Sequence, residues 1–127
     1  MFTNSPKLKI LAFGTQIMLR RLIAQVDKYE IEITSCTDAA EATNELSQKY
    51  FDIVIVDYFV KDAEQICRNA INITHIPVAV MMQEKFADWK SLRRLEADGY
   101  IPNDKGIEEM MARIRAYSRR RMVVQPV

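Results

Sequence analysis

Short apolar runs alternate along the chain with longer stretches in which apolar residues recur at helical spacing. Compact apolar runs occupy residues 9–13, 52–57 and 77–82, and a shorter run occupies 99–101. Residues 31–36 alternate apolar and polar positions, as a strand with one covered face does. The β-branched, continuous run at 52–57 is typical of a strand that is buried on both faces. These segments predict five strands.

The stretches between the apolar runs predict five helices. Residues 16–28 carry apolar positions three and four residues apart, and Thr37 or Asp38 is the expected N-cap of the next helix. The inner faces of the other four helices are marked by Ala39, Ala42, Thr43 and Leu46; by Ala63, Ile66, Cys67 and Ala70; by Phe86, Trp89, Leu92 and Leu95; and by Ile107, Met110, Met111, Ile114 and Tyr117. Regular βα alternation predicts an α/β domain, a doubly wound five-stranded parallel sheet flanked by helices.

The length of 127 residues suits one domain, which we place at residues 1–121. We expect residues 122–127 to begin a linker or tail that leads to an output domain. The formal net charge of +1 hides five arginines between Arg113 and Arg121. Cations at a helix carboxyl end complement its dipole, and we prefer this interpretation to contact with nucleic acid. DNA would then be reached through an attached output domain.

The two cysteines, Cys36 and Cys67, lie 31 residues apart among apolar neighbours. The chain has no CxxC pattern and no Cys/His cluster, so we expect buried thiols rather than a zinc site. No apolar run in the sequence is long enough to span a bilayer, including residues 53–56. We therefore expect a cytoplasmic protein that does not associate with membranes.

Asp57 ends the most apolar predicted strand. In an open parallel sheet, ligands bind beyond the carboxyl ends of the strands, near the switch in strand order. The positions to inspect are therefore 14–16, 57–59, 82–84 and 102–104, with Asp57 at the centre of the edge. Its carboxylate is a candidate nucleophile, metal ligand or cap of the following helix.

The chain resembles the receiver domains of bacterial response regulators over residues 8–121. The resemblance rests on IVIVD at 53–57, IPVAV at 76–80, ADGYIP at 97–102 and IEEMMARIRAYSRR at 107–120. The last segment is most similar to receivers that carry a winged-helix DNA-binding domain. The resemblance implies the flavodoxin-like (βα)5 receiver fold. It also implies that Asp57 stands at the position that accepts a phosphoryl group from a histidine kinase.

Other positions of the phosphorylation pocket depart from the family pattern. Gly14 and Thr15 replace the acidic pair that helps to hold Mg²⁺, Met82 replaces a Thr or Ser, and Asn103 replaces a Lys. Tyr100 keeps the switch aromatic. Each lost charge-assisted contact removes ~1.5–3 kcal/mol of transition-state stabilisation. We therefore expect phosphorylation to be suppressed by several orders of magnitude, and no metal site beyond weak Mg²⁺ binding at Asp57.

Four charged residues near the predicted edge are candidates for rescue of this pocket. Lys61 or Lys105 would substitute for the missing cation, and Glu84 or Asp104 for a missing metal carboxylate. We prefer the interpretation that all four are solvated loop charges, because such sites require closely held geometry. Accordingly, we expect no cofactor, with Mg²⁺ required only if the pocket is rescued.

Receivers of the winged-helix class dimerise through the face formed by the fourth helix, fifth strand and fifth helix. Glu109 and Arg113 match two salt-bridge partners of that face, although at i,i+4 they can also pair with each other. Gly99 and Trp89 stand where the family has an acidic and a basic residue. We assign Phe86 to the core, and Trp89 is either a core residue or an interface anchor.

The sequence therefore predicts an atypical receiver domain, or pseudo-receiver, that is not an enzyme. It would act as an interaction and dimerisation module that binds a protein partner or a second copy of itself. One alternative is a working phospho-acceptor that is modified on Asp57 and controls a DNA-binding output domain. An alternative of another class is a flavin- or nucleotide-binding enzyme on the same architecture, supported by Gly14 and Thr15 after the first strand.

Overall fold

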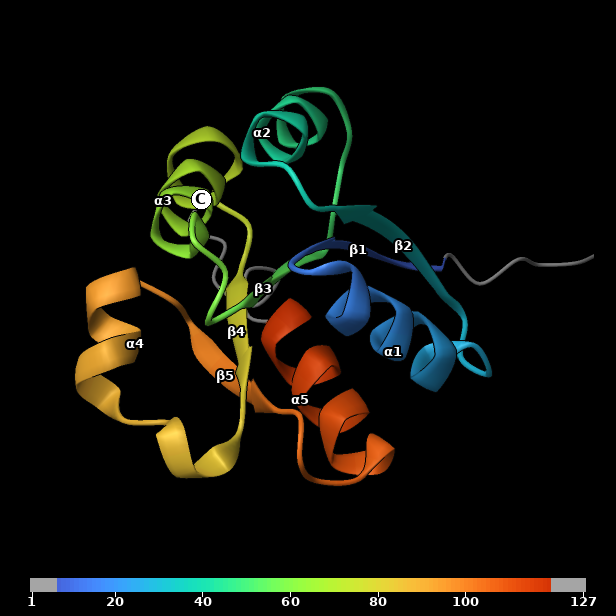
Figure 1. Ribbon diagram of the computed structural model, residues 1–127. Coiled ribbons are helices and arrows are strands. Elements are labelled where there is room, and N and C mark those ends of the chain that lie inside the picture. The colour runs from blue at the N-terminus through green and yellow to red at the C-terminus, as the bar shows by residue number, and fades with distance from the viewer. Residues whose placement is uncertain (1–6, 120–127) are drawn as a thin grey trace, which may run out of the picture.

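The computed structural model describes residues 7–119, except for the side chain of Thr74. Within these residues, five parallel strands form one sheet in the order β2-β1-β3-β4-β5 (Figure 1). The strands are β1 (Leu8–Phe13), β2 (Ile31–Cys36), β3 (Ile53–Asp57), β4 (Val78–Met82) and β5 (Gly99–Pro102). The predicted doubly wound α/β architecture is confirmed. Residues 120–121 of the predicted domain, and the predicted linker at 122–127, lie outside the described residues.

Helices cover both faces of the sheet (Figure 1). The helices are α1 (Gln16–Val26), α2 (Ala39–Gln48), α3 (Ala63–Thr74), α4 (Trp89–Leu95) and α5 (Ile107–Ser118), with a 3-10 turn, η1 (Glu84–Phe86), before α4. α1 and α5 pack on one face, whereas α2, α3 and α4 pack on the other. The first helix is shorter than predicted, since it ends at Val26 rather than at residue 28.

The central strand β3 contributes to two separate hydrophobic cores. Ile53 and Ile55 pack with α1 and α5, while Val54 and Val56 pack with the helices of the opposite face. All four side chains are fully buried, which explains why the strand is continuously apolar instead of alternating. The carboxyl end of this buried strand holds Asp57 in the middle of the sheet edge.

Side-chain caps fix the points where strands lead into helices. The Met18 amide donates a hydrogen bond to Thr15 Oγ1 at 3.2 Å, so Thr15 caps α1. Asp38, rather than Thr37, caps α2 by accepting from the Glu41 amide at 3.1 Å. The bond from the Ser91 amide to Asp88, at 2.8 Å, begins α4 and lowers the pKa of Asp88. These caps satisfy amides that have no partner within their helix.

The prediction that Phe86 belongs to the core is wrong. Phe86 lies in the 3-10 turn η1, and extended backbone at Ala87 separates it from α4, so it does not continue the inner face of that helix. Its side chain is 44% exposed and packs edge-to-face on Phe59, with ring centroids 5.5 Å apart. Leu95 holds the inner face of α4, while Trp89, at its start, is 63% exposed.

Both cysteines are buried free thiols, as predicted. Burial raises the pKa of the Cys67 thiol to about 12, so this group stays protonated and unreactive at neutral pH. None of the helices within residues 7–119 has the length and the apolar character that crossing a lipid bilayer requires.

Because β3 is buried on both faces, replacing isoleucine by valine should affect the free energy of unfolding more at Ile55 than at the exposed Ile17. Ile55 is 0% exposed, whereas Ile17 on α1 is 73% exposed. We expect Ile55→Val to lower the free energy of unfolding by about 0.5–1.5 kcal/mol because it leaves a small cavity. The matched change Ile17→Val should stay within about 0.5 kcal/mol of the unmodified chain. Urea unfolding measures both, and equal effects would contradict the assigned burial of β3.

Candidate functional site

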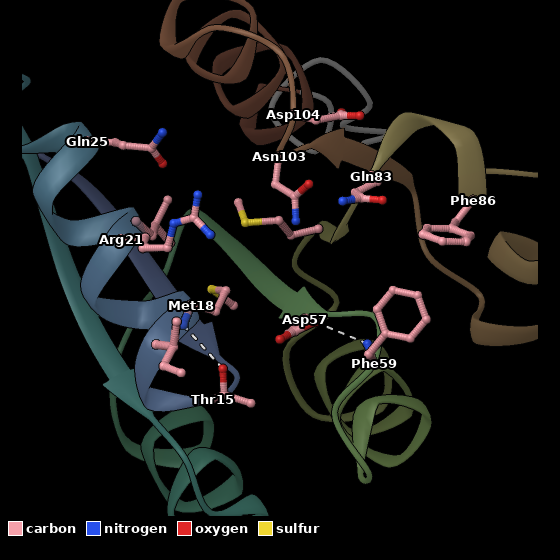
Figure 2. A pocket seen from close by; sticks show the side chains of 13 residues that line it. Thr15, Met18, Arg21, Gln25, Asp57, Phe59, Gln83, Phe86, Asn103 and Asp104 are labelled. Atoms are coloured by element: carbon pink, nitrogen blue, oxygen red, sulfur yellow. Dashed lines mark hydrogen bonds between the residues drawn. The ribbon is translucent and has the colours of Figure 1, made fainter.

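A cavity of about 500 Å³ lies at the carboxyl edge of the sheet (Figure 2). Its walls come from one side of α1 and from the residues that end or follow β3, β4 and β5. Ligands of open parallel sheets bind at this kind of edge, beside the switch in strand order. The sheet has that switch at β1 and β3, since the strand order runs outward in both directions from this pair. The cavity is therefore the candidate functional site.

Asp57 lies half-buried in this cavity, as the sequence predicts. Its Oδ1 accepts a hydrogen bond from the Phe59 amide at 3.1 Å (Figure 2). The N-cap position of α3 belongs to Asp62, so Asp57 is not the cap of the following helix. Its carboxylate instead stabilises the turn directly after β3.

Gly14 makes room for the side chain of Met18 next to Asp57. A Cβ atom on residue 14 would lie 2.5 Å from Met18 Cε and 3.0 Å from the Cβ of Asp57. Gly14 does not adopt a positive φ, so this glycine serves close approach rather than an unusual backbone shape. An apolar methyl group therefore occupies the space beside Asp57 into which a side chain at residue 14 would project.

The remaining predicted pocket positions are only partly brought together. Thr15 and Asn103 line the cavity with Asp57, although Thr15 is also the cap of α1. Met82 is 1% exposed and packs in the core on the side of α2, α3 and α4, and the preceding residue, Met81, lines the cavity instead. Tyr100 packs partly buried against the same core as Met82.

The oxygen donors of the cavity do not fit Mg²⁺. This ion requires near-octahedral oxygen ligands, commonly with one or two carboxylates. Asp57 uses one oxygen for the Phe59 amide and has the Met18 methyl group beside it, while Asp104 Oδ1 accepts from the Glu84 amide at 3.1 Å. Residues 7–119 contain no group of three or more His, Cys, Asp or Glu side chains arranged to hold a metal ion.

The four candidates for rescue differ in position. Asp104 lines the cavity, but its carboxylate already holds the loop after β4 through the Glu84 amide. Lys61, Lys105 and Glu84 are not among the residues that line the cavity.

Two polar residues that line the cavity, Arg21 and Gln25, were not singled out from the sequence, and both extend into it from α1 (Figure 2). Phe59 and Gln83, which follow β3 and β4, lie within the segments 57–59 and 82–84 that the sequence indicated. A weak signal existed on α1, where Thr15, Met18, Arg21 and Gln25 recur at helical spacing from the strand end. That spacing defines a face of the helix, but it does not reveal that this face borders the site.

On the α5 side of the predicted signalling surface, Arg113 is held within its own domain. Its Nη2 lies 3.1 Å from Glu109 Oε2, its Nη1 donates to the Tyr100 carbonyl at 3.3 Å, and its guanidinium lies 4.6 Å from the centre of the Tyr100 ring. Of the two possibilities for Glu109 and Arg113, the structure therefore shows the ion pair within one helix.

The absence of a side chain at Gly99 has a direct structural reason. A Cβ atom there would overlap the ring of Tyr117, whose hydroxyl donates to the Tyr100 carbonyl at 3.2 Å. On α4, Trp89 is exposed and carries the Arg93 guanidinium 5.4 Å from its ring centre.

Comparison with known proteins finds the receiver fold. The chain is 30% identical over 118 residues to the transcriptional regulatory protein PhoP of Escherichia coli O157:H7, covering 89% of this chain and 53% of PhoP. It thus spans about half the length of this curated relative. No protein-family model matches the chain.

Two solved structures support the same fold. The signal receiver domain of an HD domain-containing protein from Pseudomonas fluorescens Pf-5 has a TM-score of 0.80 at 15% identity, covering 97% of this chain and 95% of that one. A two-component response regulator from Clostridium difficile has a TM-score of 0.76 at 20% identity, covering 93% of this chain and 100% of that one. At these identities the structures establish the fold.

The close approach of Gly14 and Met18 predicts energetic coupling between the two positions. We expect Gly14→Ala to lower the free energy of unfolding by about 1 kcal/mol, because the end of the flexible Met18 side chain has to move and the new methyl group lies 3.0 Å from the Cβ of Asp57. In the double variant Gly14→Ala/Met18→Ala the loss should be smaller than the sum of the single losses, by about 0.5–1 kcal/mol. A double-mutant cycle from urea unfolding measures this difference, and strictly additive losses would contradict the contact.

Proposed function

We propose that this chain, a response-regulator receiver domain and a distant homologue of PhoP, acts through protein contacts without ordinary phosphorylation of Asp57. The comparisons and the fold support directly the assignment as a receiver domain of two-component signal transduction. Its status as a pseudo-receiver is our proposal. The observation that carries it is the Met18 methyl group beside Asp57, in space that a glycine at residue 14 leaves open.

The chemistry of phosphoryl transfer explains why this observation matters. The transition state spreads negative charge over three equatorial oxygens, and catalysis depends on cations and donors fixed around them. Next to Asp57, this chain places a thioether where a metal-binding carboxylate would be needed, and a neutral amide at Asn103. A thioether is a weak acceptor and donates no hydrogen bond, so it does not stabilise the developing charge.

Intact mass measurement tests the proposal. We expect the chain, incubated with acetyl phosphate and Mg²⁺, to keep its unmodified mass, because Asp57 lacks a suitable metal site. The matched control is a variant in which the pocket is restored by Gly14→Asp, Thr15→Asp, Met18→Ala and Asn103→Lys, which should gain one phosphoryl group. If the unrestored chain gains that mass and Asp57→Asn abolishes the gain, the protein is instead a working phospho-acceptor.

The surface proposed for protein contact is formed by α4, β5 and α5. Trp89 exposes 63% of its surface at the start of α4, although a tryptophan usually gains stability by burial. Aromatic residues of this kind dominate the energetics of protein interfaces. Glu109 and Arg113 are paired within α5, so the apolar side chain of Trp89, rather than their charges, would supply most of the binding energy.

The occupant that we favour for this surface is a second copy of the chain. The outer positions of α4 are basic, with Lys90, Arg93 and Arg94, whereas the first turn of α5 carries Glu108 and Glu109. A two-fold arrangement that sets α4 of one copy against α5 of the other brings opposite charges together. Charge complementarity within a single surface is thus compatible with a homodimer.

Replacement of Trp89 tests this surface. We expect Trp89→Ala to weaken self-association by about tenfold or more in sedimentation equilibrium, because a desolvated aromatic anchor is lost. Tyr50→Ala is the matched control, since Tyr50 is 64% exposed and precedes β3, far along the chain from α4. A chain that stays monomeric at all concentrations, or equal effects of both variants, would contradict the homodimer.

The proposed setting is cytoplasmic signal transduction, with DNA reached through an output domain joined to the receiver. We assign no enzyme activity to the domain itself. The flavin- or nucleotide-binding alternative rests on Gly14 and Thr15, and in this structure Gly14 makes room for Met18 while Thr15 caps α1. A flavin absorbance band in the purified protein would support that alternative.

A further inference from the structure

Within the part of the chain that the structure describes, four polar side chains that line the cavity make no hydrogen bond or ion pair that would stabilise the fold. Arg21, Gln25, Gln83 and Asn103 come from α1 and from the loops after β4 and β5. Among residues 7–119, no hydrogen bond or ion pair joins any of these four side chains to another residue. Figure 2 shows Arg21 extending into the cavity from α1 and Asn103 extending into it from the loop after β5. Their donor groups are therefore available to a molecule that enters the cavity.

The donor groups of Arg21 and Asn103 suit a ligand group that carries a single negative charge. The Arg21 guanidinium presents N–H groups in a planar fork that suits a carboxylate, and the Asn103 amide adds a further donor. Asp57 and Asp104 lie in the same cavity, so a doubly charged group such as a phosphate dianion would meet stronger repulsion than a carboxylate. Among the described charged residues that line the cavity, Arg21 is a cation, whereas Asp57 and Asp104 are anions, so a ligand carboxylate would bind beside Arg21.

The wall on the side of β3 and β4 is aromatic. Phe59 and Phe86 meet edge-to-face, with ring centroids 5.5 Å apart and planes at 84°. They are 65% and 44% exposed, although both line the cavity. Exposed aromatic surface inside a concave site is stabilised when another apolar surface covers it. A flat ring is the shape that fits against such a pair.

We propose that the cavity is a binding site for a small organic anion that consists of a flat apolar ring with a carboxylate. Arg21 and Asn103 hold the carboxylate, while Phe59 and Phe86 cover the ring. The volume of about 500 Å³ falls within the ordinary range for small-molecule sites. This function goes beyond the proposed protein contacts, because it assigns a small-molecule ligand to the cavity around Asp57, where the usual groups for phosphorylation are missing.

Titration followed by ¹⁵N NMR of the whole chain tests this site, with 2-naphthoate as the probe. We expect saturable shifts of the amides of Arg21, Phe59 and Asn103. Two comparison probes separate the contributions, since 2-naphthalenemethanol has the ring without the charge and acetate has the charge without the ring. Each should bind at least about tenfold more weakly than 2-naphthoate, because it loses one of the two sets of contacts.

Variants of two neighbouring arginines locate the binding of the carboxylate. We expect Arg21→Gln to weaken 2-naphthoate binding by about tenfold and to leave 2-naphthalenemethanol binding unchanged. Arg20→Gln is the matched control, because Arg20 is exposed on the same helix but does not line the cavity. Absence of saturable shifts with 2-naphthoate, equal binding of the charged and neutral probes, or equal effects of the two variants would overturn the proposal. The mass and self-association measurements do not depend on this result.

Discussion

Burial of the central strand on both faces is the constraint on which the rest of this structure depends. Because β3 is covered by two helical layers, its side chains must be apolar from Ile53 to Val56, and the first polar residue has to come at the edge. That residue is Asp57. In the same sheet, the carboxyl ends of the other parallel strands lie at the same edge as Asp57. The cavity lies at this edge and is lined by α1 and by residues that end or follow β3, β4 and β5. The position of the site thus follows from the packing of the core.

Much of the fold could be predicted from the sequence, because periodicity reports directly on burial. The alternation in β2 reflects a strand with one covered face, and the continuous apolar runs of β3 and β4 reflect strands that are buried on both faces. The apolar stripe of α5 reflects a helix that packs with one side against the sheet. The prediction for Phe86 was wrong because its three-residue spacing from Trp89 places both residues on one helix face only if the helix is continuous. The extended backbone at Ala87 breaks that continuity, and no feature of the spacing reveals it.

The site was predictable to a smaller extent. Asp57 could be placed because parallel strands end at a common edge, and resemblance to receivers identified the positions that depart from the family pattern. Met82 was assigned to the pocket from the resemblance to receivers, yet its side chain packs in the core, and Met81 borders the cavity. Arg21 could not be found by these means, because the sequence shows that it is exposed but not which neighbouring elements its side chain faces. Local pattern describes an element, whereas a cavity depends on how several elements meet.

The packing of Gly14 against Met18 makes the tolerance of residue 14 depend on two neighbours at once. A side chain there can be accommodated only if the end of the flexible Met18 side chain moves, because the two would occupy the same space. The new Cβ would also lie 3.0 Å from the Cβ of Asp57, which has less freedom to move because its residue ends the central strand. The identities of residues 14 and 18 are therefore linked through the space beside Asp57, and neither position can be interpreted without the other.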